Sequence, residues 1–201
     1  MKKLRLMMIV SVSLLAALAL CGLGYAAWTD TVSVPITVSA GSLGGALVDP
    51  VSTDPEGHRD PGQDMDVACT EPGRVSDDRL SFPVTVTNAY AGYRAEVLFA
   101  FENTGTIPEK VSALSIDGVP VDGPVPVAID LNADGVDDLA VACEGLFVGQ
   151  VIKVGQQQPA TLSLIMFGDG TADDDPSAPA MTGTFTFTID LIQWNVPLPG
   201  A

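Results

Sequence analysis

Large apolar residues occupy every second position in many stretches of the chain beyond residue 27. This two-residue period is that of a β-strand with one face in a core and the other in solvent. Turn-forming residues separate the stretches, and no stretch in this part of the chain has a helical period. The predicted strands are 65–70, 80–87, 94–102, 110–116, 125–130, 139–143, 148–154, 160–167 and 182–194. Short strands at this spacing predict an all-β fold, a single jelly-roll-like two-sheet β-sandwich.

The first 27 residues have a different pattern. Three basic residues precede an uncharged apolar run, 6–23, and small residues follow that run up to Ala26 and Ala27. This order is typical of a signal peptide that is cleaved after one of those two alanines. We therefore expect a signal helix over 1–27 and a mature domain over 28–201. The apolar run is also at the lower limit for a membrane span, so an uncleaved anchor is the alternative.

A strand is predicted immediately after the signal segment, over residues 29–39. Its alternating apolar residues are Val32, Val34, Ile36 and Val38. Pro35 has no N–H to donate, so the strand belongs at a sheet edge or pairs on one side only. Trp28 stands just before it and is expected to anchor it in a pocket. Because cleavage leaves this strand at a free N-terminus, it can pair with its own sheet or with that of a neighbouring subunit.

Charge becomes strongly asymmetric once the signal segment is removed. The whole chain has a net charge of −16, whereas the mature chain keeps six Lys and Arg against 25 Asp and Glu, a net charge of −19. Such a surface repels nucleic acid and anionic lipid. We therefore expect no nucleic-acid partner, and contact with the membrane only through the signal segment before cleavage.

Two cysteines remain after cleavage, Cys69 and Cys143. An even pair in an exported protein predicts one disulfide, and two buried free thiols are the alternative. The chain has no Cys-x-x-Cys pair and no Cys/His cluster, so a zinc site is not expected.

A run of acidic residues resembles the start of a calcium-binding loop. The candidate ligands are Asp130, Asn132, Asp134, Val136 through its carbonyl, and Asp138 through water. Gly135 allows the sharp turn that brings such oxygens together. The twelfth position is Val141 rather than the bidentate glutamate of an EF-hand. Calcium is therefore one prediction, and a plain acidic hairpin turn is the other.

Residues for enzymatic chemistry are scarce. His58 is the only histidine, and it lies in a proline-rich segment, 49–79, that reads as a loop. No His-Glu-x-x-His motif supplies zinc ligands, and no serine or cysteine nucleophile has a recognisable base. We expect no enzymatic activity.

Four fragments of the chain resemble one family. They are GYAAWTDT, VSAGSL, YRAEVLFAFENTGTIPEKVSALSIDG and FTFTIDLIQWN. The first resembles the junction cleaved by SipW-type signal peptidases, and together they resemble the TasA and camelysin proteins. The chain departs from the family pattern in its acidic loops, about 49–79 and 169–181.

The resemblance implies a secreted β-sandwich that polymerises into biofilm-matrix fibres or pili. In such fibres the N-terminal strand of one subunit completes a sheet of the next, so residues 29–39 are here called the donor strand. Gly41, Gly44 and Gly45 are expected to form a hinge after it. The partner is then another copy, arranged head to tail, or a related subunit. The alternatives are a monomeric cell-envelope adhesion module and, with less support, a camelysin-like metallopeptidase.

Overall fold

The computed structural model describes residues 2–27, 40–132, 135–167 and 181–198. The chain divides into two compact units, Met1–Ala40 and Gly41–Ala201. In the first, helix α1 spans Lys2–Ala27 and so covers the predicted signal segment. No helix among the described residues combines the length and apolar character needed to cross a membrane. The second unit, called the body below, begins at Gly41.

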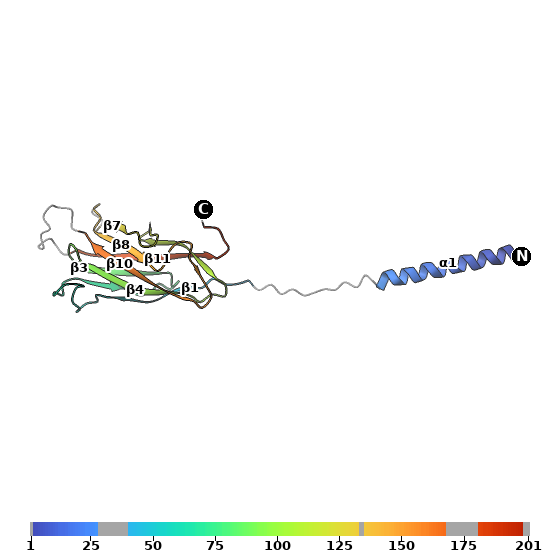
Figure 1. The fold of residues 1–201 in the computed structure, drawn as a ribbon, viewed down its shortest axis with the longest axis horizontal. Helices are drawn as coiled ribbons and strands as arrows, with labels where there is room; N and C mark the ends of the chain where they lie inside the picture. Colours follow the sequence, from blue (N-terminus) through green and yellow to red (C-terminus); the bar gives the residue numbers. More distant parts are fainter. Residues whose placement is uncertain (1, 28–39, 133–134, 168–180, 199–201) are drawn as a thin grey trace. The chain divides into compact units, whose positions relative to one another are not determined.

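The described part of the body is built from antiparallel strands (Figure 1). They are β1 (Gly45–Ser52), β2 (Cys69–Pro72), β3 (Ser81–Ala89), β4 (Arg94–Asn103), β5 (Glu109–Ile116), β6 (Val119–Pro120), β7 (Val127–Ile129), β8 (Leu139–Glu144), β9 (Val151–Ile152), β10 (Gln157–Met166) and β11 (Met181–Gln193). The predicted strands at 80–87, 94–102, 110–116 and 182–194 are confirmed with small shifts. Those at 65–70, 125–130 and 148–154 are shorter or displaced.

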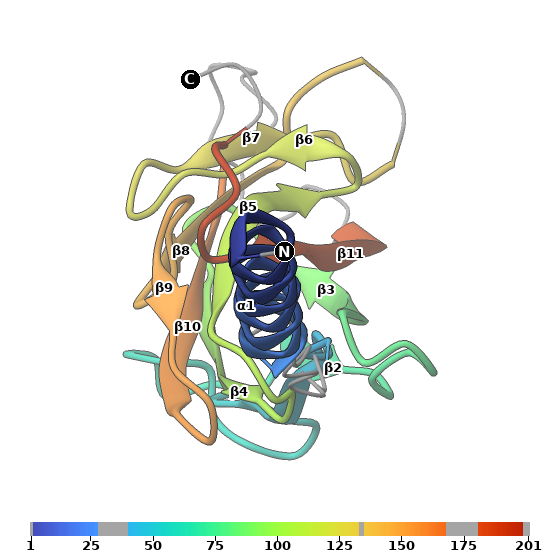
Figure 2. The same ribbon diagram turned by 90° about the vertical axis from the view of Figure 1, so that its right-hand side faces the viewer.

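Two sheets form the sandwich. One has the strand order β1-β4-β10-β8-β7, and the other has the order β2-β3-β11-β5-β6, with β9 paired to β5. Figure 2 shows β8 and β10 on one side of the body and β3 and β11 on the other. The prediction of an all-β two-sheet sandwich is therefore confirmed.

Three phenylalanines join the two sheets at the centre of the core. Phe99 of β4 faces Phe82 of β3 and Phe187 of β11, with ring centroids 5.4 and 5.2 Å away, and the latter two rings are 5.6 Å apart. All three side chains are buried. The tilted and edge-on arrangement of these rings is the one that aromatic pairs prefer.

Strand β1 was missed by the sequence analysis, which assigned residues from 49 onward to a loop. Its pairing with β4 shifts register between Val48 and Val51, where Asp49 has a φ of 48° and Pro50 lacks an N–H. Proline is tolerated in a strand at an edge or a bulge, and this position is both. The breaker residues therefore mark a bulge in an edge strand.

Candidate functional site

The predicted donor strand leads into a segment that is firmly held by the body. Thr106 N donates to Ser42 O at 2.9 Å, and Thr104 N donates to Gly44 O at 2.7 Å. Ser42 N also donates to the hydroxyl of Thr106 at 2.8 Å. Residues 41–44, called the root below, thus continue the antiparallel pairing of β1 and β4 beyond the end of β4.

Glycines allow the root to lie this close to its neighbours. A Cβ on Gly105 would lie 2.5 Å from Ser42 O and 2.8 Å from Gly44 N, and both of these are backbone atoms. A Cβ on Gly45 would lie 2.4 Å from the ring of Phe101. In place of the predicted hinge, the structure gives these glycines a packing role: Gly41 and Gly44 lie against the 103–107 turn, and Gly45, the first residue of β1, lies against Phe101 and Leu191.

Two buried polar side chains hold the root and the turn beneath it. Glu109, at the start of β5, accepts a hydrogen bond from Gly44 N through Oε1, while its Oε2 has no partner in the described part of the chain. Asn103 donates to Ile107 O and Ile152 O, and its Oδ1 accepts from Gly105 N at 2.9 Å. Burial raises the pKa of Glu109, and the bond from Gly44 partly offsets this. Neither residue was predicted, although Glu109 shares its inward strand face with Val111, as the two-residue period indicates.

Glu109 is expected to make the body less stable as the pH rises. Folding raises its pKa above the ordinary value of 4.5, so the folded state binds this proton more tightly than the unfolded state. Its contribution to the free energy of unfolding is fully present below that ordinary value and is lost as pH rises through the raised pKa. Urea unfolding of wild type and Glu109→Gln between about pH 4 and pH 8 measures this. The difference between the two proteins should change with pH, and parallel curves would contradict the assignment.

The residues predicted for the donor strand cannot be placed. Trp28, Val32, Val34, Ile36 and Val38 lie outside the described residues. Their roles therefore stay predictions. Ala26 and Ala27, the candidate cleavage residues, are the last two residues of α1.

The predicted calcium loop connects β7 to β8, and Asp134 lies outside its described part. Asp130 Oδ2 accepts from Gly135 N, and Asp138 Oδ2 accepts from Leu131 N, both at 2.8 Å. Bonds of this kind, from an aspartate to the backbone of its own loop, also occur in simple turns. Among the described residues, no three His, Cys, Asp or Glu side chains gather to hold a metal ion. Calcium at Asp130, Asn132, Asp134, Val136 and Asp138 stays a prediction.

The predicted disulfide is not formed. Cys69 and Cys143 are free thiols in different sheets, in β2 and β8. Strand β2 packs against β1 and β4, whereas β10 separates β8 from β4. Two strand spacings of about 4.8 Å, added to a sheet separation of about 10 Å, exceed the reach of a disulfide. Thr70 faces inward, so Cys69 beside it points away from the core that buries Cys143.

Thiol labelling is expected to distinguish the two cysteines. Burial raises the pKa of Cys143 to about 12, which keeps this thiol protonated and unreactive in the folded protein. In chain 28–201, purified without reductant, a thiol reagent should label Cys69 before unfolding and both cysteines after it. Cys69→Ser is the control, with no labelling of the folded protein. If the denatured, unreduced chain contained no free thiol, the two cysteines would be joined and the predicted disulfide would stand.

A second buried polar group, which the sequence did not predict, lies in the 53–68 loop between β1 and β2. The Tyr93 hydroxyl donates to Asp54 Oδ2 at 2.7 Å and lies 2.9 Å from the hydroxyl of Thr70. Asp60 accepts from Val67 N at 3.0 Å and from Ala68 N at 3.3 Å. Both carboxylates are buried, and Asp54 Oδ1 has no hydrogen-bond partner among the described residues.

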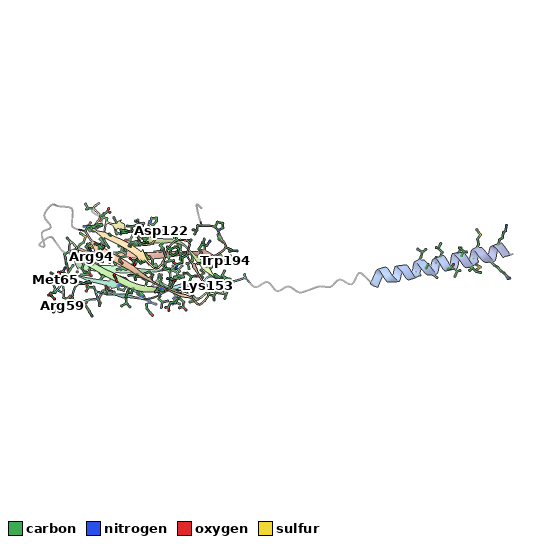
Figure 3. All side chains as sticks on the ribbon, viewed as in Figure 1. Arg59, Met65, Arg94, Asp122, Lys153 and Trp194 are labelled. Carbon is green, nitrogen blue, oxygen red and sulfur yellow. The ribbon has the colours of Figure 1, made fainter. Side chains whose placement is uncertain are left out.

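Two neighbouring tyrosines each form a hydrogen bond with one of the two buried carboxylates, Tyr93 with Asp54 and Tyr90 with Asp60. Tyr90 and Tyr93 lie 5.9 Å apart between ring centroids. Burial raises the pKa of Tyr90 to about 12, with a further increase from its hydrogen bond to Asp60. Burial also raises the pKa of Tyr93, so both hydroxyls stay protonated at neutral pH. Figure 3 places Arg59 and Met65, which belong to the same loop, at the end of the body opposite Lys153 and Trp194.

His58, the only histidine, is exposed in this same loop.

No family model, curated protein or solved structure matches the chain. The TasA and camelysin assignment therefore rests on the resemblance of the sequence fragments alone.

Proposed function

We propose that this chain is an exported structural subunit that assembles head to tail into extracellular, biofilm-matrix fibres. The donor strand, 29–39, leaves its own body and pairs with a sheet of the next copy or of a related subunit. Residues 1–27 act as a signal peptide that is cleaved after Ala26 or Ala27. Trp28 anchors the strand together with its alternating apolar residues, which are Val32, Val34, Ile36 and Val38. The proposal assigns no enzymatic activity to the chain.

The observation that carries this proposal is the fixed root of the donor strand. Residues 41–44 are held by backbone hydrogen bonds to Thr104 and Thr106 and by the buried carboxylate of Glu109. A strand that starts from a fixed point has fewer orientations to lose when it docks, which lowers the entropic cost of association. Donation of such a strand to an identical neighbour gives a non-closing contact, and repetition of that contact makes a filament.

A second feature in favour is that the body builds its core from its own residues. The described buried apolar side chains lie between Ala46 and Ile189, with both sheets contributing. The body is therefore expected to fold without residues 28–40. This leaves the donor strand available to a neighbour.

An edge strand of the body offers a place for an extended segment. Strand β1 pairs with β4 on one side, while on its other side Leu47 N donates to Arg79 O at 2.8 Å and a groove of about 880 Å³ lies beside the strand. The groove is lined by Leu47–Val51 and by residues between Pro72 and Arg79. Its charged lining residues are Arg74 and Arg79 together with Asp49 and Asp77, so the groove is not dominated by negative charge although the chain as a whole is strongly acidic.

Electron microscopy of the mature chain tests the proposal. Chain 28–201 is expected to form filaments, and chain 41–201 is expected to stay a folded monomer. Ile36→Asp should also abolish filaments, because it places a charge on the apolar face of the donor strand. Thr37→Asp, on the polar face, is the matched control and should keep them. Folded monomers from every version would refute the proposal and favour the adhesion module.

In the proposed fibre, bound calcium rigidifies the 130–138 loop and reduces the electrostatic repulsion between subunits. Filament formation by chain 28–201 is then expected to rise with added calcium and to fall with a chelator, because like charges on neighbouring subunits repel. Light scattering follows this titration. A flat response would remove this loop from the assembly mechanism.

A further inference from the structure

The buried Asp54 carboxylate has one oxygen that the described structure does not satisfy. Oδ2 accepts from Tyr93, and the backbone N of Asp54 donates to the hydroxyl of Ser52 at 3.0 Å. Oδ1 is buried and has no hydrogen-bond partner. Buried polar atoms are almost always paired, so an unpaired carboxylate oxygen needs a specific explanation.

Protonation does not supply that explanation. Tyr93 has one hydroxyl proton, which goes to Asp54 Oδ2, so Thr70 donates in turn to Tyr93. A proton on Oδ1 would turn an unpaired acceptor into an unpaired donor. A proton on Oδ2 would reverse the chain of hydroxyl bonds and still leave Oδ1 unpaired. Only a group that binds Oδ1 directly satisfies this atom.

The charges around Asp54 indicate the sign of that group. Burial raises the pKa of Asp54, and the hydrogen bond from Tyr93 partly offsets this; the nearby Asp60 and Asp66 carboxylates raise the pKa further, and His58 has the smallest, opposing effect. Asp60 is itself buried. Arg59, in the same loop, forms its ion pair with Asp64, and both of these side chains are largely exposed. Two buried carboxylates with no buried cationic side chain beside them favour a bound cation.

We propose that the 53–68 loop binds one calcium ion through Asp54 Oδ1 and the Asp60 carboxylate. All candidate donors here are oxygens, which calcium prefers and zinc does not. Two carboxylates balance the charge of one divalent ion. Backbone carbonyls and water complete the coordination, which calcium accepts in irregular geometry, whereas magnesium demands a near-octahedral shell. This site is separate from the acidic loop between β7 and β8.

Terbium luminescence tests the site, because Tb³⁺ replaces Ca²⁺ and is excited through nearby tyrosines. The purified chain with Tb³⁺ is expected to emit on tyrosine excitation, with Tyr90 and Tyr93 as the sensitisers. Added Ca²⁺ should quench this emission at lower concentration than Mg²⁺. No sensitised emission, or equal displacement by Mg²⁺, would overturn the calcium assignment.

Two variants locate the ion. Asp54→Asn keeps the side-chain shape and an acceptor for Tyr93, and because it alters a direct ligand it should weaken Tb³⁺ and Ca²⁺ binding by at least the roughly 10- to 100-fold that loss of an outer-shell partner costs. Asp130→Asn, in the other acidic loop, is the matched control and should leave the tyrosine-sensitised Tb³⁺ emission and its displacement by Ca²⁺ as in the wild type. A wild-type titration of this emission by Asp54→Asn, or its loss in Asp130→Asn, would refute the site.

A third variant keeps the test decisive if Asp54→Asn does not fold. Tyr90→Phe retains both carboxylates and removes only the hydrogen bond from Tyr90 to Asp60, so calcium affinity measured by calorimetry should fall less than in a variant that loses a carboxylate, while sensitised emission falls. Trp194 lies at the other end of the body and is a poor sensitiser for this loop (Figure 3). Unchanged emission from Tyr90→Phe would show that the ion is bound elsewhere.

Discussion

Replacing Phe99 by alanine is expected to lower the free energy of unfolding by about 3–5 kcal/mol. Its ring lies between Phe82 and Phe187 of the opposite sheet, with centroids 5.4 and 5.2 Å away. The substitution removes buried apolar area, leaves a cavity between the sheets and breaks two aromatic pairs at once. Since domains of this size have a total stability of roughly 5–15 kcal/mol, the loss is a large share of it.

Leu98→Ala is the control for this measurement. Leu98 directly precedes Phe99 in β4, but its side chain is 45 % exposed on the outer face of the sheet. Its removal should change the free energy of unfolding by about 0.5 kcal/mol or less, the range for surface positions. Urea unfolding of chain 41–201 measures both variants. Equal losses would mean that Phe99 does not join the sheets as described.

Gly105→Ala is expected to loosen the root. The new Cβ would lie 2.5 Å from Ser42 O and 2.8 Å from Gly44 N, and backbone atoms cannot rotate away as side-chain ends can. Overpacking of this kind costs about 1–3 kcal/mol. Amide hydrogen exchange at Thr104 and Thr106 should accelerate, because their bonds to the root break. If the proposed function holds, this variant should form fewer filaments than the wild type. The spectrum of its folded core should stay the same as that of the wild type.

Gly41→Ala is the matched control for Gly105→Ala. The three atoms nearest to its Cβ would all belong to the side chain of Ile107, with Cγ2 nearest at 2.0 Å, and that side chain can change rotamer. The variant should therefore retain most of the wild-type exchange protection. Similar acceleration in both variants would show that crowding by side chains, rather than by backbone, controls the root.

The sequence predicts the fold well where one face of a strand is buried. Phe185, Phe187 and Ile189 of β11 alternate with exposed or half-buried residues, and this alternation is visible without coordinates. Strand β1 was hidden because Pro50 and the flanking glycines resemble a loop, although an edge bulge tolerates both. Local pattern therefore finds the strands, but it does not distinguish a turn from a bulge.

The candidate sites were less accessible to sequence reasoning because they depend on long-range pairing. Asp54 and Tyr93 are 39 residues apart, and the antiparallel pairing of β1 with β4, in which Ser52 lies opposite Val97, brings them into contact. The Cys69–Cys143 prediction failed for the same reason, since spacing along the chain does not indicate which sheet a strand joins. Burial of Glu109 could have been predicted from the sequence, because it lies two residues before the buried Val111 and therefore on the same inward face of the strand.

The pairing of the root and β1 with β4 determines how the body would respond to mechanical load. Gly45, Ala46 and Leu47 lie opposite Asn103, Glu102 and Phe101. A pull applied through residue 40, along the strand axis, loads these backbone hydrogen bonds in shear, so several must break together. A perpendicular pull would peel them one at a time and at lower force. Because β4 also pairs with β10 along its length, the tension passes directly into the middle of a five-stranded sheet.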